Sequence, residues 1–251
     1  MADRPYTLLS CCMSLDGYLA GATRRRLLLS NDADFDRVDA VRARCDAILV
    51  GATTAAWNVM DANLAGALTD EPSISPAEQT NYAHLIREHA RWCETSGQEG
   101  SPSAFDRADL RALASVRGFN LTALSAKGAI FYGLDMEGVQ LQGAHLEGAD
   151  LRGCNLRRAD LRGARLVNAK LNGADLREAQ MGPLLLGAER VLACDLSGAS
   201  LKFAELSGAD LRQAIFAGAD VSRANFRGAL LRQANFTGVK RHGARGLEDV
   251  V

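Results

Sequence analysis

The sequence predicts a mainly β protein built around a four-sided β-helix, preceded by one helix and a short α/β segment. Three observations indicate this fold. A large apolar residue recurs at 23 of the 24 positions spaced five apart from 121 to 236. A capped amphipathic stretch precedes this repeat, and an apolar stretch with glycine turns opens the chain. The 251 residues are 47% hydrophobic and 24% charged, which fits a globular protein and excludes a disordered one.

The first 54 residues have the order strand, helix, strand that opens an α/β domain. Residues 6–13 form an apolar run, and the turn Ser14-Leu15-Asp16-Gly17 follows. Residues 34–43 have helical spacing, and residues 47–50 read as a buried strand. We therefore expect an α/β domain to begin here.

This segment resembles the reductase domain of riboflavin biosynthesis, which has a dihydrofolate-reductase-like fold. The resemblance is carried by Met13-Ser-Leu-Asp-Gly17, by Leu29-Ser-Asn-Asp32 and by the run from Arg42 to Thr53. It implies that NADPH approaches the backbone at Cys12 and at Thr54, and that Arg42 binds a substrate phosphate. The resemblance stops at Thr54, because Ala55-Ala56-Trp57-Asn58 replaces the family's next segment and the Gly-Gly phosphate loop is missing. Residues 1–54 thus look like a truncated, reductase-like α/β fragment.

Residues 55–75 are expected to form a linker, and residues 76–97 a capping helix. Ser75-Pro76-Ala77-Glu78 is a capping box with proline at the first helical position. Apolar and aromatic residues then follow at helical spacing until Gly97: Tyr82, Leu85, Ile86, His89, Trp92 and Cys93. We expect this helix to cover the first coil of the repeat, because a bare coil end would be an unpaired sheet edge.

A period of five suits neither a helix nor a straight strand. On a helix the large residues would turn by about 140° from one to the next and leave no apolar face. On a straight strand they would alternate between faces. Within one unit, however, Ala149 and Leu151 share a strand face, and a turn at Gly153 leads into the next unit. Four such corners close a square coil, and stacked coils form a β-helix.

The repeat resembles the pentapeptide-repeat family, whose pattern is A-[D/N]-L-x-x. Residues 104–240 carry the resemblance: the large position is Leu, Phe, Met or Val in 23 of 24 units, and Ala stands two places earlier in 16. It implies a right-handed quadrilateral β-helix of about six coils, roughly 29 Å long. We place this β-helix at 98–240 and a tail at 241–251. In this family, a wide aromatic end such as that of Phe216, Phe226 and Phe236 resembles a homodimer interface, with a capped monomer as the alternative.

Several positions depart from the repeat. Cys154 and Cys194 replace inward alanines and are interpreted as small core residues. The register fails between Gly182 and Val191, where Glu189 falls on an inward position. A buried lone carboxylate is costly, so a bulge is predicted there, with Glu189 in solvent or paired to an arginine. Residues 104–110 are one residue out of phase with the units that follow.

Charge and cysteine content restrict the possible functions only loosely. Residues 1–103 carry 9 Lys+Arg and 14 Asp+Glu, and residues 104–240 carry 18 and 14. Neither balance favours nucleic-acid binding, and the mixed sign argues against the acidic DNA mimics of the pentapeptide family, which protect gyrase. Six cysteines without metal-ligand spacing indicate the cytoplasm, and neither a membrane span nor a signal peptide is expected.

Two functions follow from these patterns. The first is a non-catalytic scaffold, without cofactor, metal or catalytic residues, that presents polar β-helix faces to a protein partner. The alternative is an NADPH-dependent reductase of a pyrimidine or folate-like substrate, which would use Cys12, Arg42 and Thr54. The 24 repeat units favour the scaffold.

Overall fold

The computed structural model describes residues 18–20, 26–28, 75–113, 115–187 and 190–248. The chain divides into two compact units, Met1–Glu71 and Pro72–Val251. In the first unit, strands β1 (Tyr18–Ala20) and β2 (Arg26–Leu28) pair antiparallel. This short hairpin follows the predicted turn at Ser14–Gly17 and was not predicted from the sequence. The strand, helix and second strand expected in residues 1–54 lie outside the described residues.

The second unit begins with helix α3 (Pro76–Glu94). Ser75 caps it: its Oγ accepts a hydrogen bond from the Glu78 N–H, and the Glu78 carboxylate accepts one from the Ser75 N–H. Beyond the other end, Gly97 has a φ of +86° and donates to the Trp92 carbonyl at 2.8 Å. Glycine adopts this left-handed conformation without strain and completes the turn after the helix. The helix itself ends at Glu94, three residues before the predicted end at 97.

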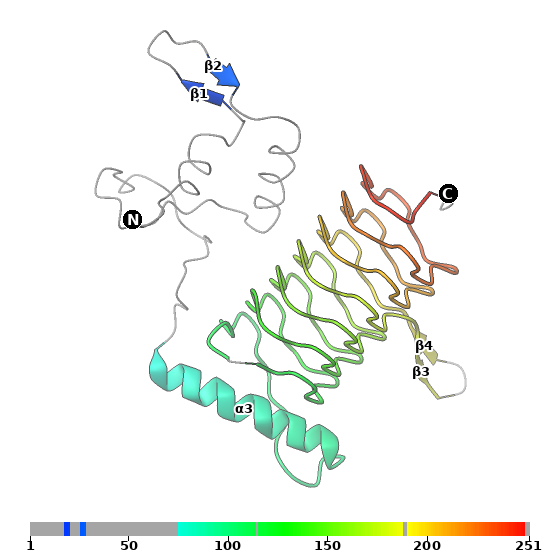
Figure 1. Cartoon of the computed structure of the whole chain (residues 1–251). Helices are drawn as coiled ribbons and strands as arrows, with labels where there is room; N and C mark the ends of the chain where they lie inside the picture. The colour runs from blue at the N-terminus through cyan, green and yellow to red at the C-terminus, as the bar shows by residue number, and fades with distance from the viewer. Residues whose placement is uncertain (1–17, 21–25, 29–74, 114, 188–189, 249–251) are drawn as a thin grey trace. The chain divides into compact units, whose positions relative to one another are not determined.

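Helix α3 packs against the first turn of the repeat. Ile86 and Ala90 are buried in its core, and the Tyr82 ring meets Phe105 edge-to-face at 6.0 Å. His89 is 2% exposed and uses both ring nitrogens. Its Nδ1 accepts from the Ser103 N–H at 3.1 Å, and Nε2 lies 3.2 Å from the Thr122 carbonyl oxygen. These contacts hold the helix across one end of the coil (Figure 1).

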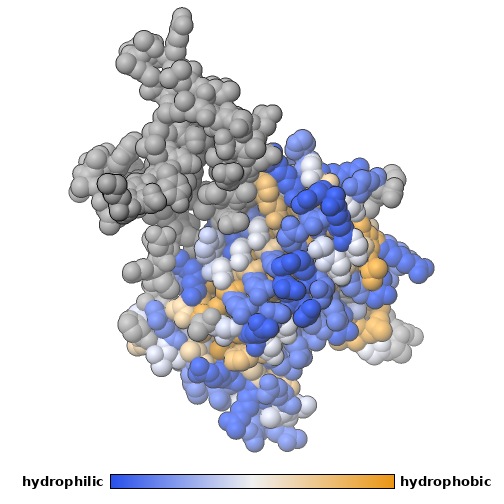
Figure 2. Space-filling model, in the orientation of Figure 1, coloured by the Kyte–Doolittle hydropathy of each residue, from blue (hydrophilic) through white to orange (hydrophobic). Residues whose placement is uncertain are grey.

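The repeat forms a coil in which parallel bridges join residues 20 apart, as between His145 and Arg165. Twenty residues are four units, so each turn of the coil has four sides. Figure 1 shows these turns stacked on one another from the end at α3 to the C-terminal end. Hydrophilic residues dominate the outer face seen in Figure 2, with apolar atoms in narrow bands between them.

The unit 149–153 shows why the pattern fits this coil. Ala149 donates to Leu146 across the corner, Asp150 donates to the preceding turn, and Leu151 and Gly153 donate to the following turn. The fifth N–H, that of Arg152, donates to the Asp150 Oδ1 at 3.2 Å. All five backbone donors are therefore satisfied, and the Asp or Asn before the large residue is the acceptor that completes the set.

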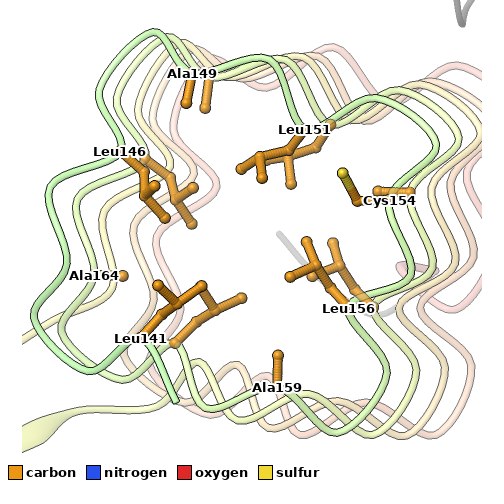
Figure 3. Close-up of a cluster of buried hydrophobic side chains, with 14 of the residues drawn as sticks. Leu141, Leu146, Ala149, Leu151, Cys154, Leu156, Ala159 and Ala164 are labelled. Atoms are coloured by element: carbon orange, nitrogen blue, oxygen red, sulfur yellow. The ribbon is translucent and has the colours of Figure 1, made fainter. Parts of the chain in front are cut away.

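The inward positions fill the coil. Ala149, Leu151, Cys154 and Leu156 point towards the axis in Figure 3, and all are fully buried. Leu161 and Leu201 are also 0% exposed, and burial of each contributes about 1.5–3 kcal/mol. Cys154 and Cys194 are core residues, as predicted.

The first turn has its own packing and register. Leu124 stands at an inward position that is usually Ala, and Ala126 at one that is usually large; both are fully buried, so the total volume is kept. Ala104 pairs with Ser125, which is 21 residues away rather than 20. This confirms that residues 104–110 are one residue out of phase with the units that follow.

The last turns are aromatic. Phe216 and Phe236, one turn apart, stack with their ring centroids 4.9 Å apart and an interplanar angle of 4°. The ladder continues to Arg245, which pairs with Asn225, five residues beyond the boundary that the periodicity suggests. Leu247 is 4% exposed and packs into the core at this end.

The ladder is interrupted where the register fails. Arg165 pairs with Asp195, 30 residues away, so ten extra residues enter one turn. They form the antiparallel hairpin β3 (Leu184–Leu186) and β4 (Arg190–Leu192), which projects from the side of the coil in Figure 1. The count of 24 inward residues is therefore wrong by two, since Leu186 and Val191 are 41% and 49% exposed. Glu189 lies outside the described residues.

Candidate interaction surface

The site residues implied by the reductase resemblance are Cys12, Arg42 and Thr54. All three lie outside the described residues, so the structure does not test whether they come together. The candidate site that the structure does describe is on the outside of the coil.

The outer surface carries a repeated ion pair. Where a unit reads Asp-Leu-Arg, the arginine Nε and a terminal nitrogen bind both oxygens of the aspartate two residues earlier. The pairs are Asp109–Arg111, Asp150–Arg152, Asp160–Arg162, Asp175–Arg177 and Asp210–Arg212. The hydrogen bonds that Arg212 donates to Asp210 lower the pKa of that carboxyl, and those that Arg162 donates to Asp160 raise the pKa of Arg162. Both partners of such a pair stay charged at neutral pH, in a fixed bidentate geometry.

The two cysteine thiols described inside the coil, Cys154 and Cys194, are buried and unreactive. Burial raises the pKa of the Cys154 thiol to about 12 and also raises that of Cys194. Each thiol stays protonated at neutral pH and is therefore a poor nucleophile. Within residues 75–113, 115–187 and 190–248 and the two short strands, no group of three or more His, Cys, Asp or Glu residues is placed to hold a metal ion.

The β3–β4 hairpin is held against the coil at Gly163. A Cβ atom on Gly163 would lie 2.9 Å from the Leu184 Cβ and 3.1 Å from the Leu192 Cβ, so the close approach requires glycine here. Because side chains alternate along a strand, Leu185 and its cross-strand partner Val191 face away from Leu184 and Leu192. Leu185 is 70% exposed.

A hollow of about 360 Å³ lies beside this hairpin. The hairpin contributes Pro183 and Leu185 from the β3 arm. The coil contributes three arginines, three glutamines, an aspartate and a glycine: Arg162, Arg212, Arg232, Gln180, Gln213, Gln233, Asp210 and Gly182. The hollow therefore has polar walls with more arginines than acidic residues, and one exposed leucine at its side.

Arg232 differs from the other two arginines of the hollow. Arg162 and Arg212 each bind the aspartate two residues earlier. At the corresponding place before Arg232 the chain has Leu230, which is 53% exposed. Among the described residues, no carboxylate forms an ion pair with Arg232. The hollow thus combines an available guanidinium with the exposed side chain of Leu185.

Sequence reasoning located the interruption at 182–191 but not the hollow beside it. One sequence feature could have pointed to it. In the unit Ala229-Leu230-Leu231-Arg232, a leucine stands where many other units have Asp or Asn. The importance of this leucine becomes clear only in the structure, where the ladder pairs Leu230 with Asp210 of the hollow.

No helix in the part of the chain that the structure describes is long and apolar enough to cross a membrane.

Two family models match the chain. The pentapeptide repeats model matches eight copies, over residues 140–178, 194–233 and 214–245. Its matched segments leave out 179–193, the region that contains the hairpin. The RibD C-terminal domain model matches residues 5–90. This match continues past Thr54, the last residue of the resemblance seen in the motifs, and reaches into α3.

Solved structures of pentapeptide repeat proteins are also similar. HetL, from the cyanobacterium Nostoc sp. strain PCC 7120 and involved in heterocyst differentiation regulation, is 27% identical over 55% of this chain and 74% of its own, with a TM-score of 0.36. A second protein from Nostoc PCC 7120 is 32% identical over 41% of this chain and 75% of its own, with a TM-score of 0.18. QnrB1, a plasmid-mediated fluoroquinolone resistance protein, is 17% identical over 56% and 69%, with a TM-score of 0.21. No curated protein matches the chain.

The eight matched copies agree with the five-residue units of the structure. One of the similar pentapeptide repeat proteins is 32% identical to this chain over three quarters of its own length. From residue 140 onward the copies matched by the pentapeptide repeats model cover most of the coil, and a segment matched by the RibD C-terminal domain model precedes it. The chain belongs to the pentapeptide repeat family.

Proposed function

We propose that this chain is a non-catalytic scaffold whose polar coil faces bind a protein partner. The observation that supports this most directly is that the coil has an apolar interior and a charged outer surface. Inward positions are filled by fully buried Ala, Leu and other apolar residues, while the outer positions hold charged pairs in fixed geometry. Polar groups held rigidly before binding lose little conformational entropy on association, which favours their use in recognition.

The scaffold is taken to be a right-handed quadrilateral β-helix of about six coils, closed at one end by α3. The contacts of Tyr82, Ile86 and His89 with the first turn support the closing role. A closed end protects the sheet edge from pairing with other chains. The opposite end, where Phe236 and Val239 are only partly buried, is a candidate contact for a second copy of the chain.

Affinity capture with the full chain tests this proposal. The wild type is compared with two variants in which an ion pair is reversed, Asp210→Arg with Arg212→Asp and Asp175→Arg with Arg177→Asp. The two pairs lie on different sides of the coil, and each reversal leaves the net charge unchanged. We expect a protein that the wild type retains to be lost with one reversal and kept with the other, while circular dichroism shows both variants folded. Capture of no protein, or equal capture by all three, would contradict the proposal.

A second candidate function is the NADPH-dependent reductase. The RibD C-terminal domain match over residues 5–90 favours it, because the match is longer than the motifs alone suggest. Cys12 and Thr54 would then lie along the cofactor, and Arg42 would bind a substrate phosphate. The interior of the coil cannot contribute a nucleotide site, since its inward side chains are fully buried against one another.

A further inference from the structure

We infer that the hollow beside the β3–β4 hairpin binds an extended acidic segment of a partner protein, with a side-chain carboxylate on Arg232 and an apolar side chain on Leu185. This inference rests on the proposed scaffold function and adds to it the place and the chemistry of recognition.

The charges of the hollow favour an anionic ligand. Three arginines and one aspartate line it, and the carboxylates of Asp160 and Asp210 neutralise Arg162 and Arg212. Arg232 remains as the cation without a carboxylate partner among the described residues. A guanidinium binds a carboxylate with two parallel hydrogen bonds, the geometry that the coil already uses in its own Asp–Arg pairs.

Exposed apolar side chains at and near the hollow favour a protein over a nucleic acid. Leu185 and Val191 are 70% and 49% exposed and stand opposite each other on the outer face of the hairpin. Leu230 is 53% exposed, one rung from Asp210 on the coil. Exposed apolar surface beside an arginine suits a protein interface, because the core of such an interface is apolar and arginine is enriched in it. A phosphate backbone would leave these leucines uncovered.

The shape favours an extended segment. The hairpin lines the hollow only through Pro183 and Leu185, so it is the β3 arm that faces the hollow. β3 and β4 form a two-stranded sheet, which leaves β3 without a strand partner on its other side among the described residues. A strand laid beside β3 would alternate its side chains, with carboxylates towards the arginines and apolar groups towards Leu185.

Fluorescence anisotropy with the full chain tests the inference. The probe is a labelled peptide in which Glu and Leu alternate, and the comparison probes are peptides that alternate Lys with Leu and Glu with Ser, and a single-stranded DNA. We expect the Glu–Leu peptide to bind more tightly than the other three. Equal or tighter binding of the Lys–Leu peptide or of the DNA would overturn the inference.

Matched variants locate the binding. Arg232→Gln should lower the affinity for the Glu–Leu peptide about fivefold. Arg227→Gln removes the same charge outside the hollow and should leave that affinity unchanged. Leu185→Ser should also weaken it, and Tyr132→Ser, at an exposed aromatic residue elsewhere, should not. Equal losses in a variant and its control would overturn the inference.

The inference and the proposed function can fail separately. If the full chain retains a protein partner equally well with and without Arg232→Gln, the scaffold function stands and the hollow is not its site. If the full chain retains no partner, the scaffold function itself fails.

Discussion

Phe216 and Phe236 lie one turn apart and stack with an interplanar angle of 4° and a centroid separation of 4.9 Å. Phe226, on another side of the coil, meets both rings edge-on at 5.9 and 6.1 Å. The three rings fill the C-terminal turns, whereas most units of the earlier turns place a leucine there. The stacking follows from the period, because residues 20 apart occupy the same side of successive turns.

Phe216→Ala should therefore lower the free energy of unfolding by about 3–5 kcal/mol, as removal of a fully buried aromatic ring leaves a cavity. Phe203→Ala is the control: Phe203 is only partly buried and stands at an outer turn position with a φ of +58°. Urea unfolding measures both changes. If both substitutions lower the free energy of unfolding by the same amount, Phe216 does not occupy the buried core position described above.

Gly163→Ala should lower the free energy of unfolding more than Gly153→Ala does. Both glycines have positive φ, +67° and +64°, so each substitution carries backbone strain of about 1–2 kcal/mol. At Gly163 the new methyl group also meets Leu184 and Leu192, whereas nothing lies within 4 Å of a Cβ at Gly153. Crowding at Gly163 should add about 1–3 kcal/mol, or displace the hairpin.

Unfolding free energies of the two variants give the comparison, and limited proteolysis at the hairpin reports its displacement. Equal stability together with unchanged proteolysis would mean that the hairpin does not rest on Gly163.

The attachment of α3 should weaken in acid. Burial lowers the pKa of His89 in the folded chain from its ordinary value of 6.5, although a hydrogen bond to the Thr122 carbonyl acts in the other direction. The unfolded chain then binds more protons between the two pKa values, so stability falls as the pH drops through 6.5 towards the folded value. Protonation would also require Nδ1 to give up the hydrogen bond from the Ser103 N–H.

Thermal unfolding at pH 8 and at pH 5 checks this prediction. His89→Gln should lower the melting temperature at pH 8 and reduce its dependence on pH. His84→Gln, at an exposed position of the same helix, should retain the wild-type dependence. The prediction fails if removal of His89 leaves the pH dependence intact.

The coil was largely predictable from the sequence because its period expresses the structure directly. Each unit contributes one inward pair and one corner, so Leu161 and Leu201 could be placed before the structure was known. The turn at 182–191 could be recognised only as a loss of register. Its hairpin depends on the contact of Leu184 and Leu192 with Gly163, about 20 to 30 residues earlier in the sequence, and no local pattern reports such a contact.

The hollow was unpredictable for the same reason. Arg162, Arg212 and Arg232 come from three turns of the coil, and only the extra ten residues of one turn bring Leu185 beside them. The three residues implied by the reductase resemblance rest on short motifs, and their arrangement stays a prediction.

The chain should not act as a DNA mimic towards gyrase. Residues 104–240 carry 18 basic and 14 acidic residues, and many of these are locked in Asp–Arg pairs. Such a surface does not reproduce the regular negative charge of a phosphate backbone. A supercoiling assay with purified full chain should show no stoichiometric inhibition. Inhibition at a one-to-one ratio would contradict this prediction.

The central claim is that the outer surface of the coil, rather than a nucleotide site, carries the function. Calorimetric titration of the full chain with NADPH tests it most directly, because hydride transfer requires a cofactor held in place by the protein. We predict no saturable binding at micromolar concentrations, for the wild type and for Arg42→Ala and Thr54→Ala alike. Tight, saturable NADPH binding that both substitutions abolish would contradict the claim and establish the reductase.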